Sequence, residues 1–303
     1  DAAPPAPALR SEAEIMRRWV GERPVVSVVC ATFEHRPFIE DALRGFLGQE
    51  TDFPFEVIVR DDASRDGTAE IVADFAQRYP NIVRSILETE NRYPEVKPGN
   101  LLRRLARGSF IAPCEGDDYW TDPRKLQVQR DGLVADAAAV ASHHRVAVIE
   151  HGVVVRPEKR SRHQCRDASA RQLARGARVL TSSLMYRNVP LLEASDPSIG
   201  VDLWLRARLG LVGSARWEPD LLPSVHRLHP GGVWSSQGEG ARARIQMRHL
   251  SGFARELRTA GHPQLAGYYR RRAVLLRAYA ALVRLHPALA RAAARLREGV
   301  LGA

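Results

Sequence analysis

The chain has 303 residues, of which 45% are hydrophobic and 26% charged, and its formal net charge at pH 7 is +10. This composition is ordinary for a globular protein, and it excludes a low-complexity or fully disordered chain. No apolar run approaches the roughly 18 residues that a membrane-spanning helix needs. The three cysteines are far apart in the sequence, which argues against a disulfide framework or a zinc site and predicts a cytoplasmic protein.

Nearly all of the positive charge is arginine. The planar guanidinium group suits phosphate, so nucleotides, nucleic acids or an anionic membrane surface are the partners that this charge indicates. A general bias of the genome toward arginine explains the composition equally well.

The proline-rich start, DAAPPAPALRSEAE, has neither a basic region nor an apolar core. It is not typical of a signal peptide, and residues 1–23 are predicted to be a flexible tail or a short helix.

Strands and helices alternate in the next hundred residues. Four runs rich in β-branched and apolar residues predict buried strands, at 25–31, 55–60, 82–87 and 109–114. Amphipathic patterns predict helices at 37–48, 66–79, 98–107 and 122–133, the last with Thr121 or Asp122 as its N-cap and Pro123 in its first turn. This alternation predicts an α/β fold with a mostly parallel sheet flanked by helices.

The second half is less regular. Strand patterns are predicted within 139–155, 178–188 and 222–236, and a helix is predicted at 201–210, ending on Gly210. From about residue 240 the pattern is helical, with breaks at Pro263 and Pro287. The predicted organisation is a domain over 24–236, with halves at about 24–122 and 123–236, and a helical extension over 237–303.

Three polar segments follow predicted strands: ATFEHR at 31–36, DDASRDGT at 61–68 and CEGDD at 114–118. Because the carboxyl ends of parallel strands share one edge of a sheet, these segments are expected to lie on one rim. With their flanking strands and helices, the three segments resemble the motifs of family 2 glycosyltransferases of the bacterial type, which have the GT-A fold. The later stretch LPSVHRLHPGGVWSS is similar to a His-Gly-Gly-containing loop of some of these enzymes.

The resemblance implies a metal-dependent, inverting transfer of a sugar from a UDP-sugar, or a dTDP-sugar, to a hydroxyl-bearing acceptor. That acceptor is a glycan, a lipid-linked sugar, a peptide or a small molecule. Ala31, Thr32 and Phe33 match positions that contact base and ribose, and Asp61 matches the residue that reads the base. Asp62 either orders the turn or contacts ribose. His35 contacts diphosphate or is a solvated loop residue.

The same resemblance makes Asp118 the metal-coordinating aspartate and Asp117 its neighbour, which contacts sugar or ribose and supports the metal. Carboxylate oxygens suit Mn²⁺ or Mg²⁺. In the His-Gly-Gly-like stretch, His229 is a metal ligand or a diphosphate contact, and Arg227 neutralises diphosphate. Trp120 lines the sugar pocket or packs under the loop.

The resemblance places the catalytic base at the start of the helix in SIGVDLWLRARLG. Asp202 is the only carboxylate there, because Ile199 and Gly200 occupy the positions of the usual Glu-Asp pair. Asp202 is alternatively a charge that complements the helix dipole, and Asp196 is the reserve candidate for the base.

Arginines recur every seven residues near the C-terminus, at Arg270, Arg277, Arg284 and Arg291. On a helix they form a stripe that faces solvent or an anionic membrane, which would place the protein at the inner face of the membrane. Two further hypotheses are a metal-dependent nucleotidyltransferase and a non-catalytic basic protein that binds nucleic acid or membrane. The first lacks a glycine-rich loop after the first strand, and the second does not need the acidic cluster. No nucleic acid partner is expected.

Overall fold

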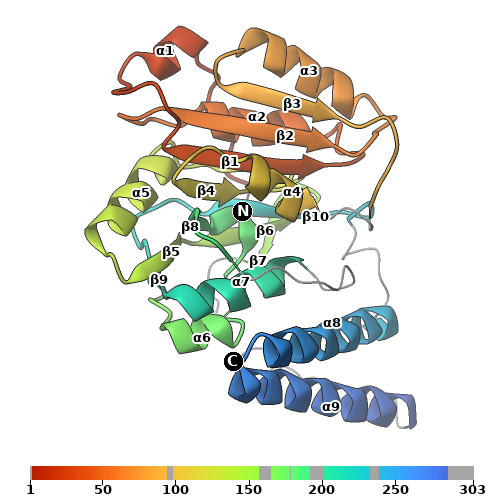
Figure 1. Ribbon diagram of the computed structural model, residues 1–303. Coiled ribbons are helices and arrows are strands. Elements are labelled where there is room, and N and C mark those ends of the chain that lie inside the picture. The colour runs from red at the N-terminus through yellow and green to blue at the C-terminus, as the bar shows by residue number, and fades with distance from the viewer. Residues whose placement is uncertain are drawn as a thin grey trace. The chain divides into compact units, whose positions relative to one another are not determined.

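The computed structural model describes residues 2–93, 98–156, 165–177, 179–191, 201–232 and 239–285 (Figure 1). The chain forms two compact units. Unit 1 comprises residues 1–167, 179–190 and 213–229, and unit 2 comprises residues 168–178, 191–212 and 230–303.

Unit 1 is built on a seven-stranded sheet. Its strands, in spatial order, are β3 (Val83–Leu87), β2 (Phe55–Asp61), β1 (Val26–Thr32), β4 (Phe110–Pro113), β8 (Met185–Arg187), β5 (Ala139–His143) and β9 (Ser214–Trp217). The first four are parallel to one another, β8 is antiparallel to both of its neighbours, and β5 is parallel to β9. The prediction of a mostly parallel sheet is confirmed.

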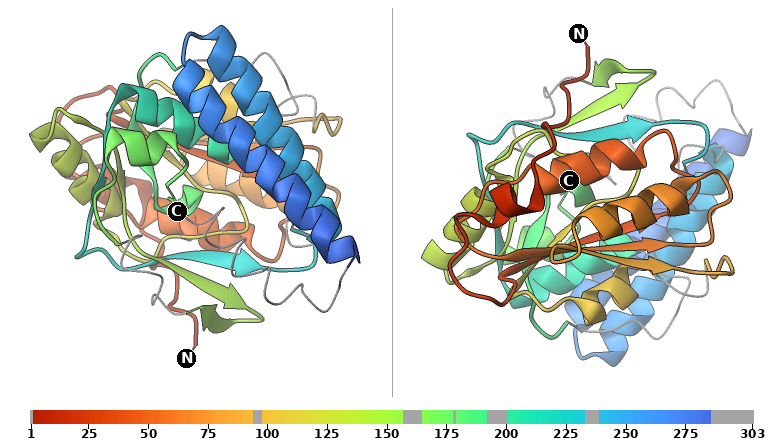
Figure 2. Two further views of the ribbon diagram at one scale, coloured as in Figure 1. Left: turned by 90° about the horizontal axis from the view of Figure 1, so that it is seen from below. Right: turned by 90° about the horizontal axis from the view of Figure 1, so that it is seen from above.

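The order of the strands creates a switch point beside β1. The chain runs outward from β1 to β2 and β3, and then returns to place β4 on the other side of β1. In open α/β sheets, ligands bind beyond the strand ends at such a point. Four helices follow these strands: α2 (Ile39–Leu47), α3 (Thr68–Arg78), α4 (Pro98–Leu105) and α5 (Lys125–Ala135). Helices α2 and α3 cover one face of the parallel strands and α4 covers the other (Figure 2).

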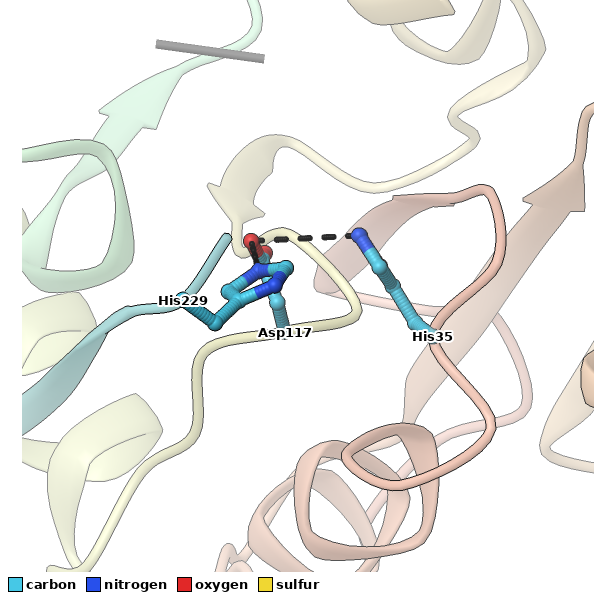
Figure 3. Close-up of side chains that lie close together, drawn as sticks. All are labelled: His35, Asp117 and His229. Carbon is cyan, nitrogen blue, oxygen red and sulfur yellow. Dashed lines mark hydrogen bonds and ion pairs between the residues drawn. The ribbon is translucent and has the colours of Figure 1, made fainter. Parts of the chain in front are cut away.

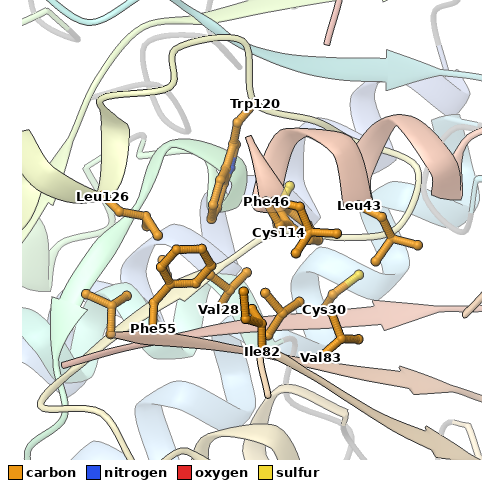
Figure 4. Packing of buried hydrophobic residues seen from close by; sticks show 14 of the residues in the cluster. Val28, Cys30, Leu43, Phe46, Phe55, Ile82, Val83, Cys114, Trp120 and Leu126 are labelled. Atoms are coloured by element: carbon orange, nitrogen blue, oxygen red, sulfur yellow. The ribbon is translucent and has the colours of Figure 1, made fainter. Parts of the chain in front are cut away.

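The core of unit 1 lies between β1, β2 and α2 (Figure 4). Val28 and Val29, whose side chains point to opposite faces, are both buried, as expected for a strand that is covered on both faces. Helix α5 begins at Lys125, three residues later than predicted. Asp122 does not cap it as proposed, because its carboxylate accepts hydrogen bonds from the Arg124 backbone and side chain and from Leu222 N.

A smaller three-stranded sheet completes unit 1, with β10 (Ser224–Leu228), β6 (Val146–Glu150) and β7 (Val153–Arg156) in that order. Strands β6 and β7 form a hairpin within the predicted strand region, and it turns at His151 and Gly152 with φ of 50° and 77°. Residues 114–119, here called the acidic loop, are tied to β10 by two backbone hydrogen bonds between Tyr119 and Val225, of 3.2 and 2.8 Å.

Residues 2–23 form a short helix with packed flanking segments rather than a loose tail. Helix α1 (Glu12–Met16) has a complete capping box, and its Ile15 side chain is buried in the core. The Trp19 indole donates a hydrogen bond to Thr51 at 3.0 Å, and the Tyr79 hydroxyl donates one to the Arg10 carbonyl at 2.9 Å. Proline and alanine in the sequence therefore mark an extended, packed segment rather than disorder.

Unit 2 is helical and contains α6 (Ala170–Ala174), α7 (Val201–Val212), α8 (Glu239–Thr259) and α9 (Pro263–Leu285). Its separate core is built around Trp204, Phe253 and Tyr269, and α8 and α9 lie side by side (Figures 1 and 2). This division differs from the predicted boundary at residue 236, because α6 and α7 belong with the C-terminal helices. None of the described helices meets the length and hydropathy of a bilayer-spanning segment.

The predicted helix end at Gly210 is wrong, because α7 continues to Val212. A Cβ atom at Gly210 would lie 2.0 Å from the backbone nitrogen of Ala174 in α6. The glycine therefore permits close helix packing.

Candidate functional site

The segments after β1 and β2 are joined into one rim. Three consecutive backbone N–H groups after β1 each donate to a side-chain oxygen after β2: Glu34 to Ser64 at 2.8 Å, His35 to Thr68 at 2.9 Å and Arg36 to Asp66 at 2.9 Å. The prediction that these segments share an edge is confirmed. These three amides are already engaged, so they do not form a free cradle for a phosphate group.

Asp61 ends β2 at this rim and is completely buried. One carboxylate oxygen accepts from Ser64 N at 2.9 Å and the other accepts from the Ser64 hydroxyl at 2.5 Å. Burial raises the pKa of Asp61, although both hydrogen bonds oppose the shift. Each oxygen retains the capacity to accept one more hydrogen bond.

Asp62 orders the backbone that follows β3. Its carboxylate accepts from the Arg60 guanidinium at 2.7 Å and from the backbone N–H groups of Arg92 and Tyr93 at 3.2 and 3.1 Å. These contacts are structural, but they order the segment after β3 rather than the turn after β2, and the contact with ribose stays a prediction.

The acidic loop lies directly against the end of β1. Gly116 N donates to the Ala31 carbonyl at 3.0 Å, and a Cβ atom at Gly116 would lie 2.6 Å from the Thr32 hydroxyl. That hydroxyl is buried and has no hydrogen-bond partner among the described residues. Phe33 follows with 42% of its surface exposed. The rim thus offers an unused hydroxyl and an open aromatic face beside the acidic loop.

A carboxylate and two histidines meet where the three rim segments and β10 converge (Figure 3). His229 Nε2 lies 3.0 Å and His35 Nε2 lies 3.8 Å from the same oxygen of Asp117. One ligand atom from each residue fits within 4.8 Å of the other two, so the three side chains are placed to share a metal ion. Two imidazoles and one carboxylate suit a transition ion such as Mn²⁺ better than Mg²⁺, which prefers oxygen ligands.

The protonation states favour this role. Burial alone would raise the pKa of Asp117, but the hydrogen bond from His229 holds it below its usual value. Burial lowers the pKa of His35, which favours a neutral ring. An ionised carboxylate and a neutral imidazole are the forms that bind a metal ion.

Asp118 points to different partners. It is only 4% exposed, and its carboxylate contacts His226 Nδ1 at 3.0 Å and accepts from Arg227 N at 3.0 Å. Burial raises the pKa of Asp118 and His226 opposes the shift. The group of three therefore includes Asp117 and His229 from the predicted metal ligands, together with His35, and it does not include Asp118.

Arg227 is enclosed by four groups. Its guanidinium lies 4.4 Å from the ring centre of Tyr119 and 5.2 Å from that of Phe38. It donates to the carboxylate of Asp41 and, at 3.0 Å, to the backbone carbonyl of Asp117. In this arrangement Arg227 connects α2 to the acidic loop, which is a different task from the predicted contact with diphosphate.

Three residues of the site were not found from the sequence: Phe38, Asp41 and His226. Phe38 and Asp41 read as ordinary positions of an amphipathic helix, and nothing in the pattern distinguishes them. His226 lies in the quoted histidine-rich stretch, but its pairing with Asp118 depends on the register between β10 and the acidic loop.

Trp120 belongs to the core. It is completely buried, its indole donates to the Ser182 carbonyl at 2.7 Å, and its ring meets Phe46 edge-on at 4.8 Å. Lys125 Nζ lies 4.3 Å from the ring centre, and burial lowers the pKa of this lysine to about 7. Of its two predicted roles, the structure therefore supports packing, and Trp120 has no exposed surface to offer a sugar.

The remaining predicted residues are not part of this cluster of side chains. Asp202 is exposed in the first turn of α7, in unit 2. Asp196 lies outside the described residues, as do Ile199 and Gly200.

Comparison with known sequences identifies a family. The model of the family described as Glycosyl transferase family 2 matches residues 27–193. An uncharacterized protein of Mycobacterium tuberculosis is 34% identical over 212 residues, which are 70% of this chain and 61% of the relative. The match thus spans less than two thirds of that relative. Staphylococcus aureus poly(ribitol-phosphate) beta-N-acetylglucosaminyltransferase TarS is 33% identical over 121 residues, 39% of this chain and 19% of that protein.

Solved structures share the GT-A fold. Residues 1–349 of S. aureus TarS, crystallised with UDP-GlcNAc, match with a TM-score of 0.53 and 18% identity, covering 75% of this chain and 66% of that one. The mannosyltransferase PcManGT of Pyrobaculum calidifontis, in complex with GDP-Man and Mn²⁺, matches with a TM-score of 0.53 and 20% identity, covering 98% and 83%.

Proposed function

Because the chain belongs to glycosyl transferase family 2, we propose that it transfers a sugar from a nucleotide-sugar to an acceptor hydroxyl with inversion, assisted by a divalent metal ion. The observation that carries this proposal is the convergence of His35, Asp117 and His229 at the switch point of the sheet. Family membership favours this activity over the nucleotidyltransferase and the non-catalytic protein that the sequence left open.

The three side chains of this cluster hold the metal ion, and Mn²⁺ is the expected ion. When bound there, a divalent ion supplies positive charge beside a leaving diphosphate. The Mn²⁺ in the PcManGT complex is in line with this expectation. Asp118 and Arg227 act indirectly, because they fix the acidic loop and β10 around Asp117.

The nucleotide lies along the rim beyond β1 and β2. The Asp61 carboxylate accepts a hydrogen bond from the imide N–H of a uracil or thymine ring. The Thr32 hydroxyl and the exposed ring of Phe33 contact the base and ribose of the nucleotide. Because Asp61 has no exposed surface, contact with the base requires the residues that cover it to move aside. UDP-sugars are the expected donors, in line with the ligand of TarS.

The proton of the acceptor hydroxyl goes to Asp202. The acceptor oxygen bonds to the anomeric carbon as the bond from that carbon to the diphosphate oxygen breaks, and the nucleoside diphosphate leaves. A single displacement of this kind inverts the anomeric centre. The cytoplasmic location predicted from the cysteines stays a prediction.

Calorimetric titration of Mn²⁺ in the presence of UDP tests the metal site. Asp117→Asn and His229→Ala should each weaken Mn²⁺ binding by about 10-fold or more, since changes to outer-shell partners already cost that much. Asp74→Asn is the matched control, because Asp74 is exposed on α3. Mg²⁺ should bind more weakly than Mn²⁺. Unchanged Mn²⁺ affinity in both site variants would refute the metal site.

Two further measurements address donor and base. A hydrolysis screen of UDP-, dTDP- and GDP-sugars identifies the nucleotide, and Asp202→Asn should bind UDP and Mn²⁺ normally while losing transfer. Transfer at the wild-type rate in that variant would remove Asp202 as the base.

A further inference from the structure

The net positive charge of the chain is confined to its C-terminal part. Residues 239–303 contain 13 arginines and three glutamates, a net charge of +10 that equals the value for the whole chain. Residues 1–238 contain 32 basic and 32 acidic residues and are formally neutral. A uniform bias toward arginine would not produce this separation.

Helix α9 shows the separation most clearly. Its 23 residues include no aspartate or glutamate. Tyr269 and Leu276 face the core of unit 2, at 0% and 2% exposure, while Arg270, Arg271 and Arg277 are exposed. The described outer face therefore has no acidic side chain of its own helix to neutralise its arginines.

Two large apolar side chains lie among these arginines. Val274 is 62% and Leu275 is 51% exposed, and both fall between Arg271 and Arg277 in the sequence. The adjoining positions Ala278 and Ala281 are small and also exposed. An exposed apolar strip bordered by cations is the pattern of a helix that lies in a membrane interface.

Helix α8 adds a second row of positive charge. Its exposed arginines are Arg244, Arg248, Arg255 and Arg258. The spacing of four, seven and three residues places them on one side of the helix. Neutral zwitterionic lipid presents no net negative charge to this row, whereas anionic lipid does.

We propose that the outer face of α9 binds the surface of an anionic lipid bilayer. Its arginines contact lipid phosphates, and Val274 and Leu275 enter the boundary between headgroups and acyl chains. A nucleic acid would use the charge but would leave both apolar side chains without a partner, whereas the interface of an anionic bilayer accommodates both features. This surface is distinct from the rim of the sheet and does not depend on the proposed transfer reaction.

Co-sedimentation with vesicles tests the proposal. The full chain should bind vesicles of phosphatidylcholine with phosphatidylglycerol, should not bind phosphatidylcholine alone, and should dissociate as salt increases. Each basic residue near an anionic surface contributes about a fivefold gain in partitioning, so R270E/R277E should lower binding about 25-fold or more. R17E/R18E is the matched control, because it makes the same change of charge at exposed arginines of unit 1 and should bind nearly as wild type.

A second variant separates insertion from charge alone. V274S/L275S keeps every arginine and should still lower vesicle binding at the low salt concentration at which the wild type binds, because it removes the apolar contribution. Wild-type binding by R270E/R277E, or equal losses in the R17E/R18E control, would overturn the proposal. The proposal would also be overturned if V274S/L275S bound vesicles normally and R270E/R277E lost the ability to bind a DNA duplex. Nucleic acid would then be the partner of these arginines. Far-UV circular dichroism and a thermal unfolding midpoint like those of the wild type would show that the variants fold, and unchanged Mn²⁺ binding keeps this test independent of the metal site.

Discussion

Asp117 and Asp118 are adjacent in the chain but contact different histidines. Asp117 meets His229 and His35, and its pKa lies below the usual value despite the opposing effect of burial. Asp118 meets His226, and burial raises its pKa. The resemblance made Asp118 the main metal ligand, whereas the structure groups Asp117 with the two histidines, because the side-chain directions depend on the pairing of the acidic loop with β10.

Asp41 should act as a positioning residue through Arg227. Asp41→Asn removes the charge that holds the guanidinium on α2, which should loosen its contact with the Asp117 carbonyl. Because the Asp41 side chain is 43% exposed, the pair should contribute about 1 kcal/mol or less, so Mn²⁺ binding should weaken about two- to fivefold. Calorimetry measures this, and steady-state kinetics should show a higher donor KM with kcat nearly unchanged.

The neighbouring Glu40→Gln provides the control, because Glu40 pairs with Arg44 along the exposed side of α2. It should bind Mn²⁺ as wild type. If Asp41→Asn behaves like this control, or alters kcat alone, Arg227 does not depend on Asp41.

At the scale of elements, the strong local patterns of the sequence predicted individual strands correctly. They did not predict the contacts between segments that are distant in the chain. The buried runs at β1, β2 and β4 carry their own signal, since β-branched and apolar residues dominate each strand, with Ser27, Glu56 and Arg60 as buried polar exceptions. The packed course of residues 2–23 and the hydrogen bonds between the two rim segments depend on partners that are distant in the sequence. Periodicity contains no information about such partners.

Gly210 and Gly267 provide a matched test of helix packing. Both are helical, but a Cβ atom at Gly210 would lie 2.0 Å from the Ala174 backbone nitrogen, whereas one at Gly267 would approach only a side-chain atom of Arg271 at 3.8 Å. Gly210→Ala must push α6 and α7 apart and should destabilise the protein by about 1–3 kcal/mol or more.

Gly267→Ala should instead stabilise the protein by about 0.5–1 kcal/mol, because alanine restricts the unfolded chain. Urea unfolding measures both changes in the free energy of unfolding. A Gly210→Ala protein as stable as wild type would show that the close approach of α6 to α7 is not required.

At the scale of the whole molecule, composition and alternation predicted the α/β class, but the assignment of helices to units required the structure. Helix α7 lies between strands in the sequence, which favoured its placement with the sheet. Its Trp204 instead packs on Phe253 of α8 at 5.0 Å between ring centres, so its apolar face belongs to the second core. An apolar helix face indicates burial but does not indicate which core receives it.

The two cores should tolerate damage separately, since every residue of the His35–Asp117–His229 cluster comes from unit 1. Phe253 is completely buried against Trp204 and Tyr269, and Phe253→Ala should cost about 3–5 kcal/mol within unit 2. Hydrogen exchange should then show lost protection in α7, α8 and α9 while β1, β2 and β4 stay protected, and calorimetry should find Mn²⁺ affinity unchanged.

Phe46→Ala, in the core beneath the acidic loop, should instead weaken both protection of β1 and Mn²⁺ binding. Equal losses of Mn²⁺ affinity in the two variants would mean that the metal site requires the helical unit as well.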